Sequence, residues 1–323
     1  MKLKALLIGC GNIGAGYDLN KPGSVWSHAK AYSLIDGIEL TVTDIDRDKA
    51  CKVAKIYSAK IINDPGKKEY KNFDLISIAT PATTHLEYLK NILNHSTSVV
   101  ICEKPVVNSL IQIDEVMNIY KSSHSNVLVN YMRRFQPAYK IAKEKLKNDF
   151  DQTSLKEIIV KYRRGFLNNA SHAVDLLEYL YDEPFYFTNF HIQTFTFDSF
   201  DHDPTLTGCC FYLDQPVNFV GICDVTYPIF EIEIFYADSK IVICHSGNEI
   251  RYYTKREDSD LREDQGERQT NILDKYMIAV IKEAIDLFNK RKTSDNFIPA
   301  LMINKRMLEI IEPLKKQNAT ISN

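Results

Sequence analysis

The chain opens with a glycine-rich turn directly after an apolar run. Residues 3–8 form the run, and a Gly-x-Gly-x-x-Gly segment follows it at once. In such a turn the first glycine permits the bend out of a strand, the second lets backbone N–H groups approach a pyrophosphate, and the third lets a helix pack on the sheet. The helix N-terminus then favours the phosphates. The pattern predicts a dinucleotide site at Gly9, Gly11, Asn12, Ile13 and Gly14.

The acidic residue that completes this motif is displaced. It is expected about twenty positions after the last glycine, but Asp44 closes the next apolar run, residues 38–43, thirty positions beyond Gly14. Residues 15–26 hold turn formers, no helical period and the chain's only tryptophan. We interpret them as an inserted surface loop. It is either a harmless addition, since loops tolerate insertion cheaply, or a lid or substrate-contacting loop.

Length and composition restrict the class of protein. A chain of 323 residues exceeds the size that one core usually serves, so we expect two domains. A net charge of −2 gives no electrostatic reason to expect nucleic acid or an anionic membrane as partner. With no long apolar stretch and no signal-peptide pattern, we expect a cytoplasmic protein. The seven cysteines lack zinc-type spacing, so we expect structural thiols and no metal.

Strand-like and helix-like segments alternate through the first part of the chain. The expected strands are residues 2–8, 38–44, 73–80, 98–102 and 126–130, and the expected helices are residues 48–57, 84–94 and 110–120. Alternation of this kind predicts an α/β fold in which a doubly wound parallel sheet, the Rossmann type, occupies residues 1–130.

The pattern changes after residue 130. A strand at 155–162 and several alternating or aromatic-rich strands between 185 and 253 are mixed with helices, and residues 255–268 read as a charged, solvated loop. The helices expected here are residues 137–148, 172–180, 272–289 and 299–315. Residues 131–323 are therefore predicted to form an α+β domain with a large, mostly antiparallel sheet.

Two segments leave strands at the edge where open α/β sheets bind ligands. Thr80 and Pro81 end one strand and should lie along the cofactor, although the threonines that follow can also serve only as a helix N-cap. Lys104 leaves the next strand with its backbone restrained by a proline, although a lysine in a cleft can be merely a solvated cation.

A third segment joins a strand of the second domain to a helix. Residues 162–175 carry His172 and Asp175, which are three apart on one helical face. A lone helical histidine is more often structural than catalytic, so this segment by itself leaves both roles open.

Taken together, these segments resemble the Gfo/Idh/MocA oxidoreductase family, which includes glucose-fructose oxidoreductase and inositol dehydrogenase. The motifs are the glycine turn, residues 79–85, 103–105, 130–135 and 171–175, and the resemblance covers nearly the whole chain. The family's histidine, usually three positions after the last glycine, corresponds to His28, fourteen after Gly14. The insertion is thus eleven residues long, and without it Asp44 falls nineteen positions beyond Gly14.

The resemblance implies hydride transfer between nicotinamide and a carbinol or ketone of a sugar or nucleotide sugar. The family subgroups with a similar pattern around Asn168 are linked to surface-polysaccharide sugars, which implies that metabolic setting. It implies NAD as cofactor, and the carboxylate of Asp44 makes NADP less favourable. Lys104 would hydrogen-bond the reacting oxygen and His172 would act as general base. Beyond the glycine turn, the implied cofactor-binding residues are Asp44, Thr80, Pro81, His85, Glu103 and Lys104.

One position departs from the family pattern. Many family dehydrogenases have an aspartate four before the catalytic histidine, whereas this chain has Asn168, whose amide cannot take a proton. Asn168 could instead orient a sugar hydroxyl, and Asp175 could supply the missing carboxylate. Arg133 and Arg163 could meet substrate phosphate or carboxylate groups, or could be structural ion-pair partners.

Two other functions occur on this fold. A redox-neutral NAD-dependent glycosidase would use transient oxidation, and a non-catalytic NAD or sugar sensor would only bind. Retention of Lys104 and His172 argues against the sensor. Several aromatic residues of the second domain supply more aromatic surface than one sheet face needs, namely Phe187, Phe190, Phe195, Phe197, Phe211 and Phe219, with several tyrosines. A homodimer or homotetramer is therefore expected, with a well-covered single-sided sheet as the competing explanation.

Overall fold

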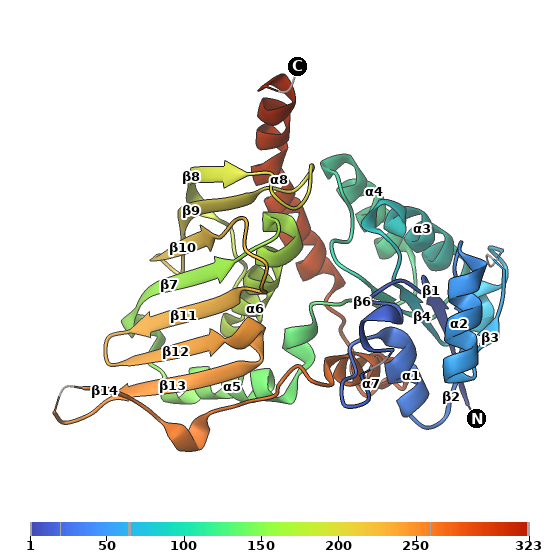
Figure 1. Cartoon of the computed structure of the whole chain (residues 1–323), viewed down its shortest axis with the longest axis horizontal. Coiled ribbons are helices and arrows are strands. Elements are labelled where there is room, and N and C mark those ends of the chain that lie inside the picture. The colour runs from blue at the N-terminus through green and yellow to red at the C-terminus, as the bar shows by residue number, and fades with distance from the viewer. Residues whose placement is uncertain (1, 20, 64–65, 259, 322–323) are drawn as a thin grey trace. The chain divides into compact units, whose positions relative to one another are not determined.

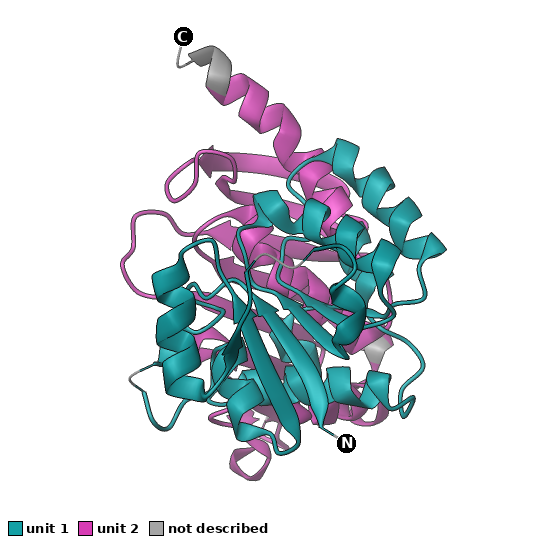
Figure 2. Ribbon diagram, turned by 90° about the vertical axis from the view of Figure 1, so that its right-hand side faces the viewer, with its two compact units in different colours: residues 1–135, 274–302 teal, residues 136–273, 303–323 magenta. Residues whose placement is uncertain are grey.

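The computed structural model describes residues 2–19, 21–63, 66–258 and 260–321. They form two compact units, each with its own sheet (Figures 1 and 2). The first unit consists of Met1–Phe135 and Asp274–Met302, and the second of Gln136–Leu273 and Ile303–Asn323.

The first unit is built on a six-stranded, all-parallel sheet. Its strands follow the order β3 (Lys60–Ile61), β2 (Ile38–Thr43), β1 (Leu3–Ile8), β4 (Leu75–Ile78), β5 (Val99–Cys102) and β6 (Val127–Val129). The central strands are apolar and fully buried because helices cover both faces. The strand order reverses between β1 and β4, and the crevice at such a reversal is where dinucleotides bind. The predicted doubly wound sheet is confirmed, and only the two-residue β3 was missed.

Four crossover helices cover this sheet. They are α1 (His28–Leu34), α2 (Arg47–Tyr57), α3 (His85–His95) and α4 (Leu110–Ser122). α1 packs on α2 and α3 packs on α4. Right-handed crossovers that run in opposite directions from the reversal point place the two pairs on opposite faces.

A late segment of the chain completes the first unit. α7 (Tyr276–Phe288) packs on β4, β5 and α1, where no crossover helix lies. Beyond it the carboxylate of Asp295 accepts a 2.7 Å hydrogen bond from Val127 N, and the amide of Asn296 bonds Val129 N and O, each at 2.9 Å. These side chains cover the free edge of β6.

The compact units therefore differ from the predicted division at residues 131–135 and 274–302. The difference arises because the packing of α7 and the edge bonds of β6 join segments that are distant in sequence. As a statement about independently folding domains, the division into residues 1–130 and 131–323 stays a prediction.

The second unit is built on an eight-stranded sheet. The order is β14 (Leu261–Glu263), β13 (Glu249–Lys255), β12 (Ser239–Cys244), β11 (Phe230–Tyr236), β7 (Leu155–Tyr162), β10 (Gln215–Gly221), β9 (Thr205–Tyr212) and β8 (Thr188–Thr196). Between these strands only β7 and β10 pair in parallel, so the predicted mostly antiparallel sheet is confirmed.

Helices lie against one face of this sheet. They are α5 (Pro137–Asp149), α6 (Ser171–Tyr181) and the part of α8 (Phe297–Ile321) that belongs to this unit (Figure 1). Alternate residues of β11 are accordingly buried and half-buried, as expected for a sheet with one covered face.

One segment of this unit differs from its predicted structure. The charged stretch 255–268, expected to be a solvated loop, contains β14, which pairs antiparallel with the end of β13. Its charged residues obscured the strand because an edge strand can carry them without burying them.

Some of the aromatic residues predicted to cover a second sheet face pack inside the second unit. Phe187 is 6 % exposed and Phe219 is fully buried, and their rings lie 5.8 Å apart, whereas Phe211 is 44 % exposed. The homodimer or homotetramer stays a prediction. Within the described residues, none of the helices has both the length and the apolar character needed to cross a membrane.

Candidate functional site

The glycine turn after β1 is shaped by close backbone contacts. Gly9 has φ +95°, and a Cβ there would lie 2.8 Å from the carbonyl oxygen of Ala79. A Cβ on Gly14 would lie 2.1 Å from the carbonyl oxygen of Gly9, whereas a Cβ on Gly11 would meet nothing within 4 Å. Gly9 and Gly14 are therefore required by the fold, and Gly11 leaves open space in front of the turn.

The turn and its surroundings fit a dinucleotide. Among the described residues, none accepts a hydrogen bond from the backbone N–H of Asn12 or Ile13, so these donors remain for a ligand. The carboxylate of Asp44, at the end of β2, accepts bonds from Cys10 N at 2.6 Å and Asp46 N at 2.8 Å. These bonds fix the acidic group beside the turn, as a ribose contact requires.

The insertion interrupts the first helix without changing its register. His28 N bonds Ile13 O at 3.2 Å and Ala29 N bonds Gly14 O at 2.9 Å. In each bond the donor lies fifteen positions after the acceptor. Without the eleven inserted residues the separation would be four positions, which is that of an α-helical hydrogen bond. The eleven-residue length inferred from the sequence therefore agrees with the bonding, and α1 continues the turn after the insertion.

The segment after β5 is held by a buried polar network. The Oε1 atom of Glu103 lies 2.9 Å from His28 Nε2 and accepts a 2.6 Å bond from Asn130 Nδ2. Burial alone would raise the pKa of Glu103, but the hydrogen bond and charge of His28, the Asn130 bond and the charge of Lys104 lower it below its usual value. Glu103 is 8 % exposed, so it positions the strand end rather than offering a free carboxylate.

His85 connects the ends of β4 and β5. Its Nδ1 lies 2.9 Å from the carbonyl oxygen of Pro105 and its Nε2 lies 2.9 Å from that of Thr80. The ring is 1 % exposed, and burial lowers the pKa of His85 although both carbonyls oppose the change. Thr80 and Pro81, by contrast, are half-buried and exposed. His85 is thus placed to hold the two predicted cofactor segments together.

The remaining candidates of the first unit differ in exposure. Lys104 is half-buried at the end of β5. Arg133 is 4 % exposed and lies in a short helical turn, Met132–Phe135, beside β6. A guanidinium that is so enclosed is better placed for a structural role than for contact with a free anion.

The candidates of the second unit lie around a single π-helical turn. Phe166–Ala170 form this turn between β7 and α6, and such turns are frequent at functional sites. The buried carboxylate of Asp203 accepts bonds from Leu167 N at 2.8 Å and Asn168 N at 2.7 Å. A Cβ on Gly165 would lie 2.1 Å from Asp203 Oδ2. Sequence reasoning missed Asp203, because no motif connects it to residues 35 positions away.

The predicted substrate residues occupy defined places in this unit. His172 is 9 % exposed and its ring meets that of Phe230 edge-on at 6.4 Å, and Asp175, one turn further along α6, is 1 % exposed. Asn168 Nδ2 donates to Arg164 O at 3.2 Å, and Arg163 Nη1 donates to Tyr227 O at 2.9 Å. Lys104 belongs to the first unit and His172 to the second.

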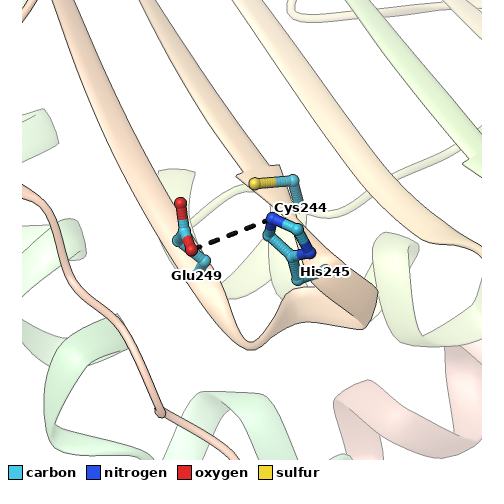
Figure 3. Close-up of side chains that lie close together, drawn as sticks. All are labelled: Cys244, His245 and Glu249. Carbon is cyan, nitrogen blue, oxygen red and sulfur yellow. Dashed lines mark ion pairs between the residues drawn. The ribbon is translucent and has the colours of Figure 1, made fainter.

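A cysteine, a histidine and a glutamate gather at one hairpin of the second sheet (Figure 3). The ligand atoms of Cys244, His245 and Glu249 lie within 4.8 Å of one another. Glu249, however, also contacts Arg251 and lies 2.6 Å from the Arg268 guanidinium. Its charge is therefore already balanced by two cations that would repel a metal ion. We propose no metal centre there.

A protein-family model matches the first part of the chain. The model of the Gfo/Idh/MocA oxidoreductases, described as an oxidoreductase family with an NAD-binding Rossmann fold, matches residues 3–131. No curated protein sequence matches the chain.

Solved structures share the fold over the whole chain. UDP-N-acetylglucosamine 3-dehydrogenase from Acidithiobacillus ferrooxidans superposes with a TM-score of 0.74 at 15% identity, covering 98% of this chain and 99% of that one. Levoglucosan dehydrogenase, in complex with NADH and levoglucosan, gives 0.74 at 15% identity, covering 98% of both chains. The transcriptional regulator Gal80p from Kluyveromyces lactis gives 0.74 at 15% identity, covering 98% and 90%. At these identities the likeness shows the fold alone.

Proposed function

We propose that the chain is an NAD-dependent dehydrogenase or reductase of a sugar or nucleotide sugar, because the model of the Gfo/Idh/MocA oxidoreductase family matches residues 3–131. The glycine turn is the observation that carries the proposal. The backbone N–H groups of Asn12 and Ile13 have no acceptor among the described residues, and two backbone hydrogen bonds hold the carboxylate of Asp44 beside the turn. The substrate class is drawn from similar structures whose proteins act on UDP-N-acetylglucosamine and levoglucosan.

The proposed chemistry divides among three groups. When bound, nicotinamide supplies the acceptor for the hydride of the carbinol C–H bond. Lys104 donates a hydrogen bond to the carbinol oxygen and stabilises the negative charge that develops there. His172 takes the hydroxyl proton as general base.

The other candidates of the second unit orient the substrate in this proposal. Asn168 contributes an amide to a sugar hydroxyl, Asp175 supports His172 from the same helix, and Arg163 offers its guanidinium to a substrate anion. Arg133, which is enclosed, supports the first unit from beside β6.

A cofactor screen tests the function directly. The purified protein is mixed with NAD and, separately, UDP-N-acetylglucosamine, levoglucosan and myo-inositol, and the absorbance of NADH is followed. We expect NADH to accumulate with at least one compound and not when NAD is omitted. Saturable NAD binding without NADH formation from any of the three compounds would favour the second candidate, a non-catalytic sensor, which the fold shared with Gal80p supports. Cleavage of an aryl glycoside without net NADH would indicate the redox-neutral glycosidase.

Cofactor preference gives a separate prediction. At about 4 Å and an effective dielectric near 20, Asp44 would repel the extra phosphate of NADP by roughly 4 kcal/mol before screening by water and salt. We expect NAD to bind at least about tenfold more tightly than NADP, although exposed Arg47, which donates to Asn63 at 3.4 Å, could offset part of this.

Asp44→Asn should reduce the preference, mainly by improving NADP binding, since the amide oxygen can still accept from Cys10 N. Asp46→Asn, two positions away at the start of α2, is the matched control. Calorimetric titration of both cofactors measures the effect. Tighter NADP binding by the unmodified protein would refute the assignment to Asp44.

A further inference from the structure

The described residues of the insertion are tied together by hydrogen bonds to one buried carboxylate. Asp18 is 1 % exposed, and its carboxylate accepts bonds from Trp26 N at 2.5 Å and from Ser27 N and Oγ at 2.9 and 2.6 Å. Three donors on one buried carboxylate close the loop upon itself, because breaking them would leave a buried charge unpaired. The Lys30 ammonium also donates to the carbonyl oxygens of Asp18 and Lys21, and the Lys21 ammonium lies 4.5 Å from the Trp26 ring centroid.

The closed loop is also attached to α7. Val25 N bonds Asp274 O at 2.8 Å, Met277 N bonds Val25 O at 3.3 Å, and the Tyr276 hydroxyl donates to Trp26 O at 2.7 Å. All these residues belong to the first unit.

α7 in turn contacts the residues around the end of β5, where Lys104 lies. Asn130 Nδ2 lies 3.9 Å from Met277 Sδ and donates to Glu103 at 2.6 Å. Burial and the neighbouring charge of Glu103, with smaller contributions from Tyr17 and Asp18, raise the pKa of Tyr276 well above its usual value. His28, which directly follows the insertion, also lies 2.9 Å from Glu103 through its Nε2 atom, so the printed hydrogen bonds connect the insertion to the end of β5 both directly and through α7.

Tyr17 is an exposed aromatic residue within the insertion. Its backbone N–H donates to Asn12 O at 2.9 Å, so Tyr17 lies directly against the glycine turn. Its side chain is 50 % exposed. A cofactor whose adenosine ribose meets Asp44 would cross the turn toward the ends of β4 and β5 with its nicotinamide half. Tyr17 is bonded to the glycine turn that such a cofactor would cross.

We propose that Tyr17 and the hydrogen-bonded residues around Asp18 form a preformed wall of the cofactor site, in which the ring of Tyr17 contacts the nicotinamide half of the dinucleotide. The inference rests on the proposed use of NAD and adds a contact that the shared glycine turn does not supply. A large flat ring that is already held in place gains contact with little loss of conformational entropy.

Comparison of NAD with ADP tests the proposal, because ADP has the adenosine and pyrophosphate and lacks the nicotinamide half. Calorimetric titration of the full chain should show that Tyr17→Ala weakens NAD binding about tenfold and changes ADP binding by less than about twofold. Tyr17→Phe, which keeps the ring, should bind NAD nearly as the unmodified protein does. Leu34→Ala is the control, since Leu34 is 57 % exposed at the far end of α1.

The emission of Trp26 provides a second readout. It is the chain's only tryptophan, so intrinsic tryptophan fluorescence reports the insertion alone and should change with NAD more than with ADP. Unchanged NAD affinity in Tyr17→Ala, or equal loss of NAD and ADP affinity, would overturn the inference while leaving the proposed function intact. An unmodified protein that binds neither nucleotide would instead contradict the proposed function.

Discussion

Replacing His172 by alanine is expected to lower turnover by about 10²- to 10⁴-fold, the usual contribution of a positioned acid or base. Lys104→Ala is expected to cost roughly 10²-fold or more, because a donor to developing negative charge acts mainly in the transition state. Both variants should keep nearly normal NAD affinity, since the N–H donors of the glycine turn and the Asp44 carboxylate are untouched.

The two substitutions need a control that separates chemistry from folding. His245→Ala removes a histidine from the same unit whose side chain is 65% exposed at a hairpin, and should leave turnover unchanged. Steady-state kinetics with the sugar identified by the cofactor screen, together with far-ultraviolet circular dichroism, measures the effects. Full turnover in both Lys104→Ala and His172→Ala would mean that neither residue has the role proposed for it.

Local sequence patterns were enough to predict most of the first unit. The parallel strands, the glycine turn and the acidic strand end depend on short-range periodicity and turn chemistry, which a sequence displays directly. Even the length of the insertion could be inferred from the sequence, since removing eleven residues restored the expected spacing of His28 and Asp44. The bonds from His28 and Ala29 back to the turn give the physical reason, because the helix keeps its register across the loop.

Long-range contacts could not be predicted in this way. α7 looks like any amphipathic helix, and its packing on β4 and β5 depends on an uncovered sheet face that is visible only in three dimensions. Asp203 supports the π-helical turn before α6 from a loop with no recognisable motif. From the sequence, Asp18 looks like a polar loop residue, although it is buried and accepts hydrogen bonds from Trp26 and Ser27 in the structure. In each case the partner is set by tertiary packing rather than by neighbours in the sequence.

The two glycines Gly11 and Gly14 should respond differently to the same substitution. Gly14→Ala places a methyl group 2.1 Å from Gly9 O and 3.0 Å from its carbonyl carbon, and this backbone cannot move aside without opening the turn. We expect a loss of about 1–3 kcal/mol in the free energy of unfolding, as for other overpacked sites. NAD affinity should fall by about 10²-fold or more, because the displaced N–H groups lose their charge-assisted bonds to the pyrophosphate.

Gly11→Ala is the matched control for this prediction. A Cβ at Gly11 meets nothing within 4 Å, so the free energy of unfolding should change by less than about 0.5 kcal/mol. The methyl group would nevertheless occupy the space through which the pyrophosphate approaches, and NAD affinity should fall about tenfold or more. Thermal unfolding and calorimetric titration of both variants separate the two effects. If Gly14→Ala unfolded like the unmodified protein, the close turn would not be needed for stability, and if Gly11→Ala bound NAD normally, the cofactor would not lie against the turn.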